Sequence, residues 1–175
     1  MSADNIIETR IESMAQIAEL IKITLDAGVP YTLNHPKGRS MYRVIVTETD
    51  SVVLDKPDDL KRFDAVLFRR KSGAYVLHRI EKINGDTLTI CGDNQTSTEN
   101  IDRSQVIAKL TAIIRTENGI TRTIKADDEV MQKQIRSIYR RKPILRAFLK
   151  VRHIIAVPVK KLFRIPERSN KNTRK

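Results

Sequence analysis

A serine, a histidine and an aspartate in the middle of the chain have the side chains that peptide-bond hydrolysis needs. Ser40 lies in the run Gly38-Arg39-Ser40-Met41, and His78 and Asp93 follow it. A serine hydroxyl is a weak nucleophile at neutral pH unless an adjacent base takes its proton. A histidine is such a base when a carboxylate accepts a hydrogen bond from its second ring nitrogen. The three residues are therefore a candidate catalytic centre, provided that the fold brings them together.

The turn signal Asn84-Gly85 predicts how two of these residues lie. Asn-Gly is typical of two-residue hairpin turns, and such a turn would place His78 directly opposite Cys91. His78 and Asp93 would then be diagonal neighbours on one face of the sheet, about 7–8 Å apart at the backbone. At that separation the Asp93 carboxylate could accept a hydrogen bond from the imidazole.

Each of the three residues also has a purely structural interpretation. His78 shares its predicted face with Val76 and Ile80, where a histidine can belong to the core. Gly92-Asp93-Asn94 is typical of a turn in which the aspartate accepts hydrogen bonds from backbone N–H groups. A serine beside a glycine, as at Ser40, is common in loops. None of the three residues indicates catalysis by itself.

The chain from Tyr31 to about Ile124 is predicted to be mainly β, because short apolar runs alternate with turn residues. Strands that follow one another without helices between them favour an antiparallel meander or a small barrel. The predicted strands are Tyr31–His35, Arg43–Thr47, Ser51–Leu54, Asp64–Arg70, Ala74–Ile83, Asp86–Cys91, Val106–Arg115 and Gly119–Ile124.

An amphipathic helix is predicted before the strands, over Asn5–Ala27, with Asp4 as its N-cap and Gly28 as its stop. Apolar residues recur at helical spacing along it and define one face. The face comprises Ile7, Ile11, Met14, Ala18, Ile21 and Leu25. We expect this helix to pack on the β region through Ile7, Ile11, Met14 and Ile21.

Two further helices are predicted after the strands, over Asp127–Arg141 and Ile144–Arg164. Pro143 should break the helix between them, and Pro158 should kink or end the second one. The predicted organisation is mainly β (α+β), with four parts. They are an N-terminal helix (1–28), a β domain (29–125), a basic helical segment (126–166) and a disordered tail (167–175).

The net charge of +12 is concentrated at the C-terminal end. Residues 133–175 hold fifteen Lys and Arg and one acid, a net charge of +14, whereas residues 1–132 hold eighteen basic and twenty acidic residues, a net charge of −2. Such segregation predicts an anionic partner or a solvated tail. Residues 143–164 combine an apolar stripe with a cationic one, the pattern of a helix in an anionic membrane interface. The alternative is that Ile144, Phe148, Val151 and Ile155 pack on the β domain.

Several classes of protein are not expected. The first predicted helix is too short for a helix-turn-helix domain and carries as much acid as base, so nucleic-acid binding is not predicted. The single cysteine, Cys91, excludes an internal disulfide and a Cys-rich zinc site, and we expect no metal or other cofactor. No secretory signal pattern and no apolar run of roughly 20 residues is present, which favours a cytoplasmic protein, at most peripheral to the membrane.

Five motifs, in order, resemble the successive boxes of the signal peptidase / LexA-like serine peptidase superfamily. They are Gly38-Arg39-Ser40-Met41, Asp64-Ala65-Val66-Leu67-Phe68, Tyr75-Val76-Leu77-His78-Arg79-Ile80, Gly92-Asp93-Asn94 and Val106-Ile107-Ala108-Lys109. The resemblance covers about Tyr31 to Arg115. Within this superfamily the chain most resembles small soluble members with His-Arg-Ile followed by Gly-Asp-Asn-Gln. The resemblance implies an antiparallel β fold and serine endopeptidase activity.

The resemblance also implies residue roles. Ser40 would be the nucleophile, His78 the general base, and Asp93 the acid of the branch that uses histidine. The backbone N–H of Ser40 would form part of the oxyanion hole. Gly38 and Met41 would belong to the substrate loop, which the glycine keeps open.

The chain departs from the family pattern at several positions. Glu99, followed by Asp102, stands near the place of a second aspartate of the histidine branch. Arg43 replaces a proline that is common in membrane members. We also expect no transmembrane helix, because no apolar run in the sequence is long enough for one.

The expected function is therefore a serine endopeptidase that cleaves a signal- or leader-type peptide bound as an extended strand at a sheet edge. One alternative is a catalytically inactive adaptor that binds peptides through the same fold. Another is a LexA-like regulator that cleaves itself. The candidate bond, Ala27–Gly28, lies only twelve residues before Ser40, and we expect no DNA-binding domain in the residues that precede it. Substrate and oligomeric state stay open.

Overall fold

The computed structural model describes the backbone of residues 13–162 and the side chains of residues 13–149. The chain divides into two compact units, one ending at Arg140 and the other beginning at Arg141. Each unit is described by itself. The first contains helix α1, all strands and the first turns of helix α2, and it carries the candidate site. The predicted tail, 167–175, lies outside the described residues.

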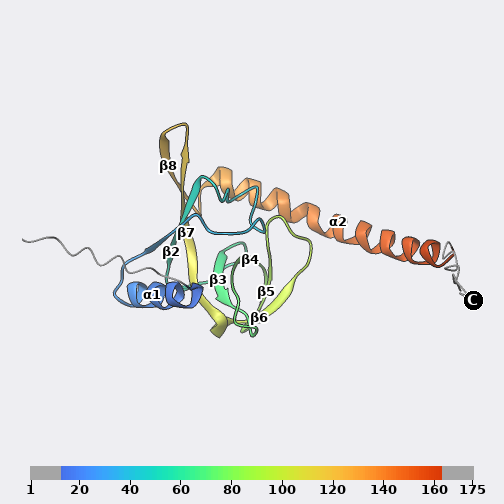
Figure 1. The fold of residues 1–175 in the computed structure, drawn as a ribbon, viewed down its shortest axis with the longest axis horizontal. Coiled ribbons are helices and arrows are strands. Elements are labelled where there is room, and N and C mark those ends of the chain that lie inside the picture. Colours follow the sequence, from blue (N-terminus) through green and yellow to red (C-terminus); the bar gives the residue numbers. More distant parts are fainter. Residues whose placement is uncertain (1–12, 163–175) are drawn as a thin grey trace, which may run out of the picture. The chain divides into compact units, whose positions relative to one another are not determined.

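The first unit is a mainly antiparallel β domain in which one eight-stranded sheet curls into a half-barrel (Figure 1). The order of neighbouring strands is β1-β2-β7-β3-β4-β5-β6, and β8 pairs with β7. This confirms the prediction of a mainly antiparallel β domain with helices before and after it. The strands are β1 (Tyr31–Asn34), β2 (Asp50–Asp55), β3 (Ala65–Arg69), β4 (Tyr75–Asn84), β5 (Thr87–Cys91), β6 (Glu99–Asp102), β7 (Val106–Glu117) and β8 (Ile120–Lys125).

Strand β7 holds the sheet together, because its successive parts pair with different partners. Its start pairs with β3, its middle with β2 and its end with β8. Register shifts in β2 and β3 bend the sheet at these junctions. Two apolar clusters result. The larger lies among α1, β2, β7 and α2, and the smaller lies among β3, β4, β5 and β6.

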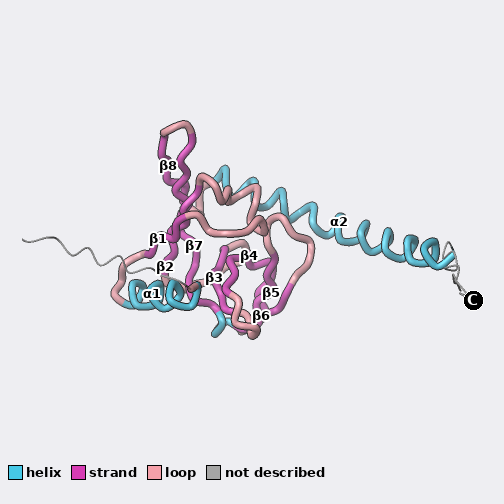
Figure 2. Tube along the Cα trace, viewed as in Figure 1, coloured by secondary structure: helices cyan, strands magenta, loops and turns pink. Residues whose placement is uncertain are grey.

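The predicted strand Arg43–Thr47 is wrong. The chain between β1 and β2 is a loop (Figure 2), with turns closed by hydrogen bonds from Tyr42 N–H to Arg39 O and from Ile45 N–H to Met41 O. Val44 and Ile45 are buried in the larger cluster, so this run is apolar because it fills the core. Strand β6 was not predicted, since its sequence Glu-Asn-Ile-Asp is mostly polar.

Helix α1 (Met14–Asp26) begins later than predicted. Ser13 is its N-cap and forms a capping box with Gln16. Gly28 follows the C-cap with φ +78°, as predicted for the stop. Ile21 is buried as expected, but Met14 is 42% exposed, so its predicted packing role is wrong. Asp4, Ile7 and Ile11 lie outside the described residues.

Helix α2 (Glu129–Leu162) is continuous, so the predicted break at Pro143 is wrong, as is an end at Pro158. A proline removes one helix hydrogen bond, and the helix can continue on both sides of it. Asp128 Oδ1 accepts hydrogen bonds from Val130 and Met131 N–H at the start. Within the described residues, no helix combines the length and the apolarity that crossing a bilayer requires.

Candidate active site

The turn that carries Ser40 is held by the segment that follows β5. Asn94 N–H donates to Ser40 O at 2.8 Å, and Asn94 Nδ2 donates to Arg39 O at 3.3 Å. Gly92 lies so close that a Cβ atom there would be 2.7 Å from Ser40 O and 3.0 Å from Ser40 Cβ. Two of the sequence motifs therefore meet in space, and glycine is required where they touch.

The rest of this loop is held by a buried carboxylate. Asp50 is fully buried at the start of β2 and accepts a hydrogen bond from Val46 N–H at 2.7 Å. Arg115 of β7 binds Asp50 through two nitrogens, at 2.7 and 2.8 Å, and also donates to Val44 O. The Arg115 hydrogen bond and charge offset the burial of Asp50, so the pKa of its carboxyl lies below the usual value. These contacts fix the backbone that follows Ser40.

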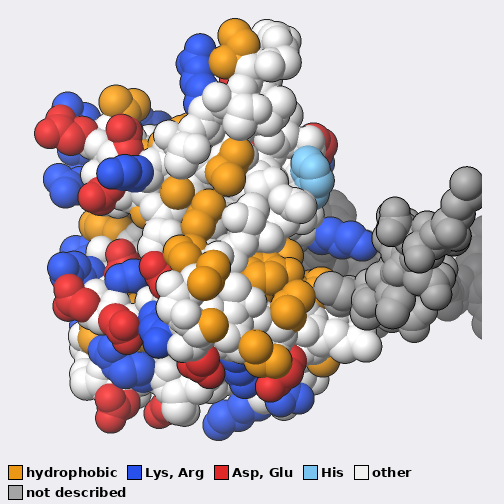
Figure 3. All heavy atoms as spheres, turned by 90° about the vertical axis from the view of Figure 1, so that its left-hand side faces the viewer, with side chains coloured by type: hydrophobic (Ala, Val, Ile, Leu, Met, Phe, Trp, Pro, Cys, Tyr) orange, Lys and Arg blue, Asp and Glu red, His pale blue; other side chains and the backbone are white. Residues whose placement is uncertain are grey.

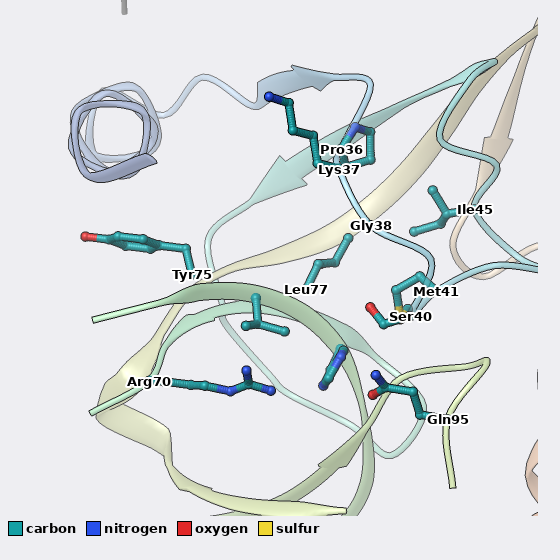
Figure 4. Close-up of a pocket in the computed structure, with 12 residues that line it drawn as sticks. Pro36, Lys37, Gly38, Ser40, Met41, Ile45, Arg70, Tyr75, Leu77 and Gln95 are labelled. Atoms are coloured by element: carbon teal, nitrogen blue, oxygen red, sulfur yellow. The ribbon is translucent and has the colours of Figure 1, made fainter. Parts of the chain in front are cut away.

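Ser40 and His78 line the same cavity of about 270 Å³. Gly38 and Met41 line it as well, so four of the five predicted site residues share one cavity. Gly38 has φ +103°, a conformation that favours glycine. The remaining lining residues are Pro36, Lys37, Ile45, Arg70, Tyr75, Val76, Leu77 and Gln95. Figure 4 shows Ser40 beside Gln95, and the side chain of Arg70 points into the cavity from the β3–β4 hairpin.

His78 is buried, with 3% of its surface exposed, and its Nδ1 lies 3.4 Å from Glu99 Oε1. The contact lacks hydrogen-bond alignment, which leaves Nδ1 buried without a hydrogen-bond partner. Burial lowers the pKa of His78 below its ordinary value, while Glu99 raises it and Arg70 lowers it. The imidazole is therefore neutral at neutral pH, the state that a general base needs.

Glu99 is anchored by Arg70 at the end of the β3–β4 hairpin. Arg70 Nε donates to Glu99 Oε2 at 2.8 Å, and Arg70 Nη2 donates to Glu99 Oε1 at 2.5 Å. This pairing lowers the pKa of the Glu99 carboxyl, so it is ionised beside His78. The sequence alone did not indicate a contact between Glu99 and His78, because this contact depends on strand β6, which was not predicted.

Asp93 does not contact the cavity. Both of its carboxylate oxygens accept hydrogen bonds from Arg79, at 2.8 Å each, and both side chains are buried. Arg79 also donates to Phe63 O at 2.7 Å. The expected hydrogen bond between Asp93 and His78 is therefore not formed, and Asp93 instead anchors the segment that holds Ser40.

The predicted register between β4 and β5 is wrong by one residue at this point. Cys91 pairs with Arg79 and not with His78. The turn is Gly85-Asp86, one residue later than predicted, and the register shifts again between Ile80 and Lys82. A one-residue slip moves a side chain to the opposite face of a sheet. Arg79 consequently takes the diagonal position next to Asp93.

Ser40 and His78, although both line the cavity, are not joined by a hydrogen bond in the described structure. Among the described residues, the backbone N–H of Ser40 donates no hydrogen bond. The catalytic roles of both residues stay predictions.

An open strand edge borders the cavity. Tyr75 to Arg79 of β4 pair with β3 on one side, but β5 pairs with β4 only from Arg79 onward. The other edge of residues 75–78 is therefore free of strand partners among the described residues. All four of these residues line the cavity. An extended peptide could add to this edge beside Ser40.

Among the described residues, no cluster of His, Cys, Asp or Glu could hold a metal ion. Comparisons of the chain with protein-family models, with curated proteins and with solved structures gave no match.

Proposed function

We propose that the protein is a serine endopeptidase of the signal peptidase / LexA-like type, with Ser40 as nucleophile and His78 as general base. The observation that carries the proposal is that both residues line one cavity beside an unpaired strand edge. The neutral, buried imidazole and the tightly held Ser40 turn support it.

In the proposed reaction, His78 takes the proton of the Ser40 hydroxyl while the oxygen attacks the peptide carbonyl. Glu99 faces Nδ1 and is the positioning residue that favours the tautomer with its proton on that nitrogen. Nε2 is then the basic nitrogen. The free Ser40 N–H would donate to the oxyanion, as proposed for this family. Asp93 supports the site through the Ser40 turn, not through His78.

The proposed substrate is an extended leader-type peptide that pairs with residues 75–77 of β4. Met41, Ile45 and Leu77 give the cavity an apolar side, which suits a small apolar side chain next to the scissile bond. Self-cleavage at Ala27–Gly28 is disfavoured, because this bond lies in the C-terminal cap of α1. The backbone N–H groups of both residues are hydrogen-bonded within this cap, Ala27 N–H to Ile23 O and Gly28 N–H to Leu25 O. A protease, in contrast, binds its substrate in an extended conformation.

A peptide-binding adaptor without catalytic activity is the second candidate. The missing Ser40–His78 hydrogen bond favours it, since the open edge and the cavity could hold a peptide without cutting it. Apo peptidases also have loose catalytic hydrogen bonds that tighten with substrate. Only a measurement of turnover separates the two candidates.

The test is incubation of the full chain with a library of proteome-derived peptides, followed by mass spectrometry of new termini. We expect new termini with the parent and with Ser104→Ala, an exposed serine that does not line the cavity. Ser40→Ala and His78→Gln should produce none. Retention of library peptides by both the parent and Ser40→Ala, without new termini, would instead support the adaptor.

A further inference from the structure

The distal unit, from Arg141, contains a helix whose sequence combines many cations with an apolar stripe. In its described part, helix α2 is the only element, about 33 Å long over residues 141–162. Residues 141–162 hold seven Lys and Arg and no acid. A lone helix in water needs something to cover its apolar side.

Most cations of this helix lie opposite its main apolar stripe, although Arg141 and Arg152 fall at the edge of the stripe and Leu149 and Val157 fall among the cations. Apolar positions at helical spacing fall within an arc of about 80°, at 100° per residue. These are Ile144, Phe148, Val151, Ile155, Val159 and Leu162. Arg146, Lys150, His153, Lys160 and Lys161 fall on the opposite side. Cations opposite a continuous apolar stripe are typical of a helix that lies in a membrane interface.

The cationic character belongs to this end of the chain and not to the whole protein. Residues 1–132 have a net charge of −2. On the face of the domain shown in Figure 3, Lys and Arg side chains are intermingled with Asp and Glu. An anionic surface would therefore attract the C-terminal end selectively.

We propose that the distal half of α2 binds the surface of an anionic lipid bilayer, with its apolar stripe in the interface and its cations at the headgroups. The stripe favours lipid over a nucleic acid, because contacts with phosphates require cations but no apolar side. The proposal is independent of the peptidase assignment.

The test is co-sedimentation of the full chain with vesicles of phosphatidylglycerol and phosphatidylcholine, against vesicles of phosphatidylcholine alone. We expect binding to the anionic vesicles at low salt and its loss at high salt. The cation variant Lys150→Gln/Lys160→Gln/Lys161→Gln should bind about a hundredfold more weakly. The control Lys22→Gln/Lys56→Gln/Lys82→Gln, which removes three exposed cations of the first unit, should bind as the parent does.

A second variant, Val151→Ser/Ile155→Ser/Val159→Ser, tests the apolar stripe and should also lose binding. Unchanged binding by this variant would overturn the proposal, because attraction would then be purely electrostatic. Absence of parent binding at low salt would overturn it too. So would tighter binding to duplex DNA than to vesicles. A different result would indicate that the apolar stripe packs on the protein itself: the parent does not bind vesicles, and Val151→Ser/Ile155→Ser/Val159→Ser unfolds at a lower temperature than the parent.

Discussion

Replacing Asp93 by Asn separates a structural role of this residue from a catalytic one. Asp93 and Arg79 have side chains that are 0% and 2% exposed, and two hydrogen bonds of 2.8 Å join them. The substitution leaves the Arg79 guanidinium buried and charged, with Phe63 O and a single neutral amide oxygen as its remaining acceptors, and places an NH2 donor beside it. Removing one partner of a buried ion pair costs about 3–5 kcal/mol. In a domain of this size the unfolding midpoint should fall by roughly 6–20 °C.

The matched control is Arg79→Leu/Asp93→Leu, which removes both charges. It leaves the Phe63 carbonyl without its Arg79 donor, a cost of about 1–3 kcal/mol, so it should be more stable than Asp93→Asn. Denaturant unfolding of the parent, the single variant and the double variant measures this order. The reasoning is refuted if Asp93→Asn loses less than about 1 kcal/mol of folding free energy and yet abolishes cleavage. Asp93 would then act on His78 as first predicted from the sequence.

Three further predictions concern the cavity. Glu99→Gln removes the anion beside His78 and leaves the Arg70 cation, so the pKa of His78 should fall. The acid limb of the pH–rate profile should then shift to lower pH. Gly92→Ala would push a Cβ atom into Ser40 O and should cost about 1–3 kcal/mol in unfolding experiments while slowing turnover; normal stability and rate would contradict the close approach. Because the folded-state pKa of His78 is lowered, the unfolded chain binds the proton first, and stability should decline as pH falls from about 6.5 towards the folded-state pKa. His78→Gln should lack that part of the decline; an identical decline would assign it to other groups.

The sequence predicted most strands because apolar alternation and turn residues mark them directly. It failed at Arg43–Thr47, where β-branched residues fill the core from a loop, and at β6, whose polar residues give no such alternation. It could place Ser40 and His78 near one another only through family resemblance. The sequence predicted the wrong partner for Asp93. The hairpin turn lies one residue later than predicted, and the register shifts again after Ile80. Together these two changes bring Arg79, and not His78, onto the same face of the sheet as Asp93.

Fluorophosphonate labelling tests the central claim, that His78 activates Ser40, most directly. We predict that the probe modifies Ser40 in the parent and in Ser104→Ala, as identified by peptide mass spectrometry. His78→Gln should slow the modification by about 10²–10⁴-fold while keeping the parent's unfolding midpoint at pH 8, where His78 is neutral in both states. Modification of Ser40 at the parent rate in His78→Gln, or no modification of Ser40 in the parent, would contradict the account.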